Sequence, residues 1–93
     1  MSTNNSTPQF TFSFYRFVGQ NGSRTTEVVR DFSQADGMRG LVDRNPKLIE
    51  LAIRRVTEWG DAKGISITVQ EPYPSDKHPG KVWLEFRFGG LTL

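Results

Sequence analysis

The sequence predicts an α+β fold in which a four-stranded antiparallel sheet, in the order ββαββ, packs on one main helix as a two-layer sandwich. Three observations predict it: apolar and polar residues alternate in three segments, a favoured two-residue turn follows the first of them, and one amphipathic stretch has helix start and stop signals. The 93 residues fit a single domain. We expect residues 10–93 to form that domain and the polar residues 1–9 to be a disordered tail.

The first two strands are expected to form a hairpin. Phenylalanines recur at every second position at the start of residues 10–18, which is typical of a strand. Asn21-Gly22 favours a two-residue turn, because both positions of that turn need a positive φ. The second strand then covers about residues 25–32.

The turn also predicts the register of the hairpin. With two residues in the turn, Arg16 falls opposite Glu27 and Phe14 falls opposite Val29, which gives one ion pair and one apolar pair. A loop longer by one residue would instead place Phe14 opposite Val28.

Residues 33–44 are expected to form a short, irregular helix. Ser33 can cap its start, and the apolar Met38, Leu41 and Val42 recur at helical spacing. Two glycines within the segment weaken this helix, since glycine is a poor helix former.

The main helix is expected to begin at Asn45-Pro46 and to stop at Gly64. Asparagine caps free backbone N–H groups, proline at the first helical position loses no intrahelical bond, and glycine commonly ends a helix. Between these signals, apolar residues recur at three- and four-residue steps, as on one side of an amphipathic helix. They are Leu48, Ile49, Ala52, Ile53, Val56 and Trp59.

Two further strands are predicted at residues 65–70 and 81–88, where apolar and polar residues alternate again. Between them, residues 71–80 hold three prolines, which remove backbone donors, so a long exposed loop is expected. One face of the sheet then packs on the main helix. The strand residues expected in that core are Phe10, Phe12, Phe14, Ile65, Ile67, Val69, Val82, Leu84, Phe86 and Phe88.

The opposite sheet face has no predicted cover and is the first candidate site. Exposed aromatic side chains beside arginine or lysine suit stacking on unpaired bases or anchoring a protein interface. The alternative is that Tyr15 and Trp83 only stabilise the sheet as cross-strand partners, or lie beneath the short helix or the proline loop. The aromatic and cationic residues expected on this face are Tyr15, Phe17, Lys81, Trp83 and Arg87.

The solvent side of the main helix is the second candidate site. Arg54 and Arg55 are adjacent there, and arginine reads phosphate and carboxylate groups through a planar fork that lysine lacks. The alternative is a solvated helix face with weak ion pairs, because Glu50 and Glu58 each lie four residues from Arg54.

The composition argues against catalysis. The chain has no cysteine and a single histidine, His78, which excludes cysteine-containing and multi-histidine zinc sites. Ser75 and Asp76 lie beside His78 in sequence, but the members of a catalytic triad converge from rigid supports and need an oxyanion hole. Glu71, Asp76 and Glu85 have no spacing that pairs two carboxylates in a pocket. We expect no enzyme, no metal, no cofactor and no small-molecule substrate.

The hydropathy and the net charge of the chain indicate where the protein is located and what kind of partner it binds. No apolar run approaches the length of a membrane helix, and the first nine residues lack a secretion-signal pattern, so a cytoplasmic protein with no membrane partner is expected. The formal net charge of +2 is compatible with an acidic or nucleic-acid partner.

In size and style the chain resembles the small anti-CRISPR inhibitors that phages encode. The resemblance is carried by the polar lead, the compact body over residues 10–88, the absence of cysteine, and the set Tyr15, Arg54, Arg55, Trp83 and Arg87. It implies an inhibitor that docks on an RNA-guided CRISPR surveillance complex in the host cytoplasm and blocks target DNA binding. The charge of +2 differs from that of acidic, DNA-mimicking inhibitors, so contact with guide RNA or with acidic protein patches is expected.

Two other functions compete with this one. The first is a freestanding single-stranded RNA- or DNA-binding domain that stacks bases on the open sheet face. The second is a small structural or assembly protein that dimerises through the sheet face or through edge strands.

Overall fold

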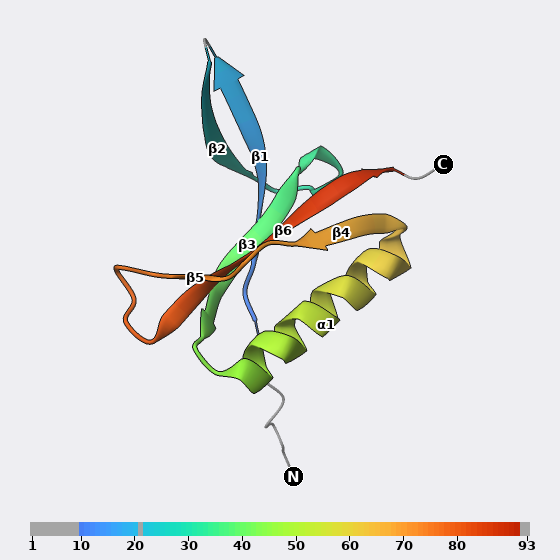
Figure 1. The fold of residues 1–93 in the computed structure, drawn as a ribbon. Helices are drawn as coiled ribbons and strands as arrows, with labels where there is room; N and C mark the ends of the chain where they lie inside the picture. Colours follow the sequence, from blue (N-terminus) through green and yellow to red (C-terminus); the bar gives the residue numbers. More distant parts are fainter. Residues whose placement is uncertain (1–9, 21, 92–93) are drawn as a thin grey trace.

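The computed structural model describes residues 10–20 and 22–91, so the predicted tail over residues 1–9 lies outside the described part. The predicted α+β class is confirmed: helix α1 (Pro46–Lys63) packs against an antiparallel sheet (Figure 1). The strands follow the order β2-β1-β3-β6-β4, and β5 also pairs with β6. Their bounds are Ser13–Gln20 for β1, Ser23–Val29 for β2, Gly37–Asp43 for β3, Ile65–Val69 for β4, Tyr73–Pro74 for β5 and Lys81–Leu91 for β6.

The β1–β2 hairpin has the register that a two-residue turn predicts. Phe14 lies opposite Val29, and Arg16 lies opposite Glu27. The ion pair is formed, because Arg16 Nε donates to Glu27 Oε2 at 2.6 Å. Gly22 has a φ of 82°, as the second position of this turn type requires.

The helix predicted at residues 33–44 is wrong. A single 3-10 turn, Phe32–Gln34, is followed by β3, which lies in the sheet between β1 and β6. The two glycines that weaken a helix are needed in this strand. A Cβ on Gly40 would lie 2.4 Å from the carbonyl oxygen of Thr11, and one on Gly37 would lie 2.2 Å from that of Phe86. The described part of the sheet therefore has six strands, and the predicted four-strand count is wrong.

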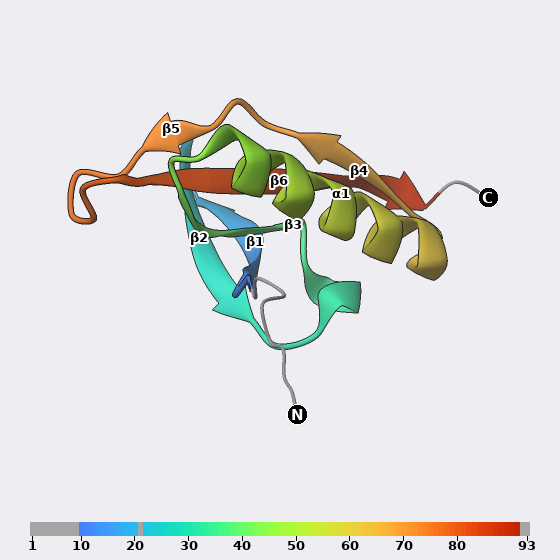
Figure 2. The same cartoon turned by 90° about the horizontal axis from the view of Figure 1, so that it is seen from below.

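The signals predicted for the main helix are confirmed. Asn45 Oδ1 accepts from the backbone N–H of Lys47 at 2.9 Å, Pro46 opens the helix, and Gly64 ends it with a φ of 74°. The proline-rich segment is less irregular than predicted, because β5 pairs with β6. Figure 2 shows β4 and β5 along the same side of β6.

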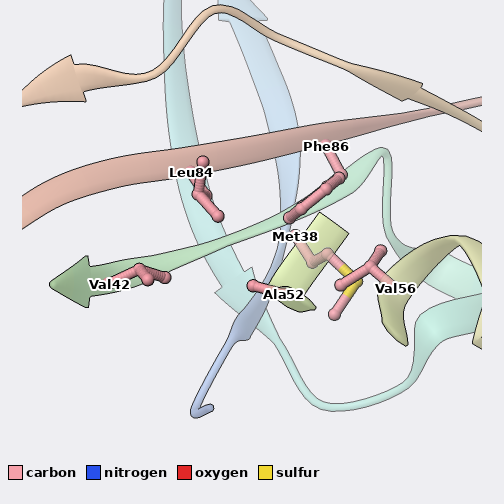
Figure 3. Close-up of a cluster of buried hydrophobic side chains, with 6 residues drawn as sticks. All are labelled: Met38, Val42, Ala52, Val56, Leu84 and Phe86. Carbon is pink, nitrogen blue, oxygen red and sulfur yellow. The ribbon is translucent and has the colours of Figure 1, made fainter. Parts of the chain in front are cut away.

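The core lies between α1 and one face of the sheet, which we call the inner face. Figure 3 shows its buried centre, where Ala52 and Val56 of α1 meet Met38 and Val42 of β3 and Leu84 and Phe86 of β6. Most of the predicted core residues pack here, but Val69 is 38% exposed, so its place in the predicted core is wrong. The partly buried residues around this centre are Phe10, Phe12, Phe14, Leu48, Ile49, Ile53, Trp59, Ile67 and Phe88.

Candidate functional site

The face of the sheet opposite α1, here called the outer face, carries the aromatic and cationic residues of β1, β3 and β6. The strand registers bring Ser13 beside Arg39, and Leu41 beside Trp83. Tyr73 of β5 lies on the other side of Trp83. Residues from four strands thus share one surface, as the alternation of side chains along each strand requires.

Tyr15 does not lie open on this surface. Its side chain is fully buried, and its hydroxyl donates to Glu85 Oε2 at 2.7 Å. Phe17 packs on it edge to face, with ring centroids 5.4 Å apart. A Cβ on Gly37 would lie 2.7 Å from the Tyr15 hydroxyl, so glycine leaves room for the ring. The prediction of Tyr15 as an exposed stacking residue is wrong.

Burial keeps the Tyr15 hydroxyl protonated at alkaline pH, where an exposed tyrosine would ionise. Desolvation by burial, followed by the hydrogen bond to Glu85, raises the pKa of the tyrosine well above its usual value. A tyrosine hydroxyl is protonated at neutral pH in any case, so the raised pKa extends its donation to Glu85 to higher pH. This bond ties β1 to β6 across the outer face.

Arg39 lies at the centre of the outer face. Its guanidinium carbon is 5.4 Å from the ring centroid of Tyr15 and 6.0 Å from that of Trp83. Its Nη2 donates to Thr26 Oγ1 at 3.2 Å. Within residues 10–20 and 22–91, no carboxylate forms a salt bridge with Arg39. The guanidinium is thus held in place, and its remaining N–H groups can donate hydrogen bonds to a ligand.

The two other cations predicted for this face do lie on it, but each has a carboxylate nearby. Lys81 Nζ is 2.6 Å from Asp43 Oδ1. Arg87 Nε is 3.8 Å from Glu85 Oε2, and its guanidinium lies over the ring of Phe17 at 5.3 Å. Of the outer-face cations whose side chains the structure describes, Arg39 is the one without a carboxylate partner.

A groove runs along Arg39, with a volume of about 410 Å³. Val28 forms part of one wall and is 69% exposed, while Trp83 forms part of the other and is half-buried. The groove therefore presents one guanidinium between apolar and hydroxyl-bearing walls, a setting suited to a carboxylate or phosphate with apolar neighbours. Its lining residues are Thr11, Ser13, Val28, Arg39, Gly40, Leu41 and Trp83.

The helix arginines lie in the other layer of the fold. Arg54 is exposed on α1, whereas the guanidinium of Arg55 lies over the ring of Phe10 at 5.6 Å. The predicted pairs of Arg54 with Glu50 and Glu58 are not among the salt bridges of the described residues. The sheet separates these arginines from Arg39, so the predicted site residues do not form one site.

Sequence reasoning missed Arg39 because it placed residues 33–44 in a helix. The signal that could have found it is the alternation Met38, Arg39, Gly40, Leu41, Val42, in which the first, third and fifth residues are buried. Read as a strand, the same residues put Arg39 and Leu41 on the face opposite the core.

Ser75 and His78 do come together in the loop before β6. Ser75 is buried, and its Oγ lies 3.2 Å from His78 Nδ1. Backbone bonds from Ser75 to Lys81 and from Lys81 to His78 close the same loop. The side-chain contact therefore adds to a set of bonds that hold the loop against β6.

The described residues contain no group of three or more histidine, cysteine, aspartate or glutamate side chains that could hold a metal ion. Within the same residues, α1 is not apolar enough to cross a membrane. Comparison of the chain with protein-family models, with curated proteins and with solved structures found no match.

Proposed function

We propose that this chain is a non-enzymatic binding protein that docks through its outer face on a protein subunit of an RNA-guided CRISPR surveillance complex, and thereby blocks target DNA binding. The observation that carries the proposal is the position of Arg39 in the groove. Its guanidinium is held over Tyr15 and Trp83 without a carboxylate partner in the described part of the chain. A cation fixed in this way loses little conformational entropy on binding.

Several features favour a protein partner over a nucleic acid. Binding along a nucleic-acid backbone needs several cations that neutralise phosphates. Here Lys81 and Arg87 already contact Asp43 and Glu85. Stacking on successive bases needs several open rings, but Tyr15 is fully buried and Trp83 is half-buried, which leaves Tyr73, 42% exposed, as a single open ring beside them. One guanidinium in a groove with apolar walls suits instead an acidic side chain of a protein flanked by apolar ones.

The groove has the composition of an interface centre. Arginine and tryptophan are enriched among the residues that dominate protein binding energy, and they act best where surrounding residues exclude water. Trp83 and Leu41 are half-buried beside Arg39, and the exposed Val28 extends the apolar wall. Replacement of Arg39 or Trp83 is therefore expected to weaken the complex by about 1–2 kcal/mol or more.

The test is phage plating on a bacterial host with an active CRISPR system that targets the phage. Expression of the wild-type chain should restore plating. Arg39→Gln removes one positive charge from the outer face, and Arg54→Gln removes one from α1, so the two variants are matched in charge. We expect that Arg39→Gln no longer restores phage plating and that Arg54→Gln still restores it, provided that both variants are expressed and folded.

Three results would contradict the proposal. If the wild-type chain restores plating in none of several hosts with different CRISPR systems, the inhibitor function is wrong. Restored plating that is lost with Arg54→Gln and kept with Arg39→Gln would move the site to α1. Binding of single-stranded RNA by the purified chain, weakening steeply with added salt, would favour a nucleic-acid-binding domain instead.

A further inference from the structure

Strand β2 lies at one end of the sheet. It pairs with β1 along its whole length, from Ser23 opposite Gln20 to Val29 opposite Phe14. No other strand within residues 10–20 and 22–91 pairs with it. Figure 1 shows the β1–β2 hairpin projecting away from α1, so the helix does not cover this edge.

The backbone groups on the open edge of β2 can be identified from the contacts of β1. The carbonyl oxygen of Tyr15 accepts from the backbone N–H of Asp36, and the N–H of Phe17 donates to Asp36 Oδ2, so both groups point away from β2. Their cross-strand neighbours, Val28 and Thr26, are thus in non-hydrogen-bonded pairs with β1. The backbone N–H and C=O groups of Thr26 and Val28 therefore face the open edge, and by the two-residue period so do those of Arg24.

This edge lacks two of the usual protections against strand pairing, proline and a bulge, although it carries the charged residues Arg24 and Glu27. Proteins blunt edge strands with proline, with bulges or with inward-pointing charges. The sequence of β2 contains no proline, and its pairing with β1 is continuous without a bulge. Thr25, Thr26, Val28 and Val29 are β-branched, which favours extended backbone. Val28, 69% exposed, places an apolar side chain next to the edge.

We propose that β2 pairs with β2 of a second copy of this chain, antiparallel and about a two-fold axis centred on Thr26. In this register Thr26 lies opposite Thr26 of the second copy, and Arg24 lies opposite Val28 in both directions. The residues whose backbone groups face the open edge are Arg24, Thr26 and Val28. In this register each of them lies opposite another of the three, and each such pair exchanges two backbone hydrogen bonds. Opposed threonines also stabilise neighbouring strands.

Charge and length favour this register over its neighbours. A two-fold axis centred on Glu27 would place that carboxylate directly opposite its own copy, and like charges opposite each other are destabilising. An axis centred on Thr25 would place Val28 opposite Gly22 of the turn, beyond the end of the partner strand. With the axis on Thr26, Glu27 lies opposite Thr25 and keeps its bond to Arg16.

The dimer would join two outer faces into one surface. An antiparallel pair about a two-fold axis keeps corresponding side chains on the same side of the sheet. Val28 lines the groove beside Arg39 and lies close to the proposed axis, so both grooves would open on the same side. A partner with two equivalent subunits could then be bound at both grooves, with a gain from effective concentration.

The first test is sedimentation velocity of the wild-type chain and of a matched pair of variants. Thr26→Pro removes the outward N–H, whereas Thr26→Ala keeps it, and both lose the bond to Arg39. Because edge pairing buries little area, we expect a weak dimer whose sedimentation coefficient rises between about 5 and about 500 µM. Thr26→Ala should retain this rise, and Thr26→Pro should remain monomeric while keeping its circular dichroism spectrum.

The second test reads the register through single cysteines, which the cysteine-free sequence makes specific. Cα atoms of a directly opposed pair lie within disulfide range, so Thr26→Cys should form a cross-linked dimer on mild oxidation. The two copies of Val28 would be about 14 Å apart along the strands, so Val28→Cys should not cross-link at equal concentration. Monomeric wild-type chain at every concentration, unaltered dimerisation of Thr26→Pro, or faster cross-linking of Val28→Cys would overturn the proposal.

Discussion

The two faces of the sheet use aromatic side chains in different ways. On the inner face, Phe14, Trp59 and Phe88 pack ring against ring, with centroids 5.8–6.5 Å apart. On the outer face, the rings of Tyr15 and Trp83 lie instead beside the guanidinium of Arg39. The inner rings stabilise the fold by apolar burial, whereas the outer rings hold a cation in a fixed position. A substitution of an inner-face ring should therefore affect mainly stability, whereas a substitution of Arg39 or of the half-buried Trp83 should affect mainly binding.

The largest effect on stability is expected at the centre of the inner face. Phe86 is fully buried between α1 and the sheet, and Phe12 packs on it edge to face at 5.6 Å. Phe86→Ala should lower the free energy of unfolding by about 3–5 kcal/mol, through lost burial and a residual cavity. Urea denaturation measures this loss. If Trp83→Ala on the outer face costs as much, the distinction between the two faces is wrong.

A smaller loss is expected at the crossing of β3 by the segment before β1. An added Cβ on Gly40 would lie 2.4 Å from the backbone oxygen of Thr11 and 2.6 Å from a ring carbon of Phe12. Gly40→Ala should cost about 1–3 kcal/mol, because the backbone has to shift. Gly89→Ala is the control, since the nearest atom to its added Cβ is 3.5 Å away. Equal melting temperatures for the two variants would contradict the close packing of the segment before β1 on Gly40.

The Tyr15 hydroxyl should contribute about 1–3 kcal/mol, because Tyr15→Phe leaves Glu85 without this donor. Its contribution also depends on pH. The pKa of Tyr15 is raised in the folded chain, whereas an unfolded tyrosine ionises near pH 10. The stabilisation is therefore complete below about pH 10 and is lost as the pH rises above it. In alkaline denaturation series, the stability of Tyr15→Phe should fall less steeply than that of the wild-type chain.

The smallest effect is expected at the surface ion pair of the hairpin. Arg16 and Glu27 are each about half exposed, so solvent screens their attraction. Glu27→Gln should change the free energy of unfolding by less than about 1 kcal/mol. A loss as large as that of Gly40→Ala would mean that the pair has a structural role beyond the surface.

The sequence predicts the features that depend on neighbouring residues, but not those that depend on contacts between distant ones. The hairpin register follows from Asn21-Gly22, and the bounds of α1 follow from Asn45 and Gly64, because these signals act over a few neighbouring residues. The use of Gly40 in β3 depends on Thr11, which is distant in sequence. A local pattern cannot show that contact, and the spacing of apolar residues there fits a helix as well as a strand.

The helix predicted at residues 33–44 also changes the expected composition of the candidate site. Once residues 33–44 are placed in a helix, Arg39 has no place on the sheet, and Tyr15 has no residue to enclose it. The structure instead places β3 beside β1, so that Arg39 lies over the Tyr15 ring. The alternation along β6 predicts the correct face for Trp83, Lys81 and Arg87, but it does not show which residues of β3 lie beside them.

The central claim is that a protein partner docks on the outer face and leaves α1 open. Single cysteines at Thr11, an exposed groove residue, and at Glu58, an exposed residue of α1, allow a direct measurement, because the chain has no other cysteine. The rate of maleimide labelling is measured for each variant, alone and with the surveillance complex of a host in which expression of the chain restores phage plating. We predict slower labelling of Thr11→Cys in the complex and an unchanged rate for Glu58→Cys. Slower labelling of Glu58→Cys alone would contradict the claim and place the partner on the helix.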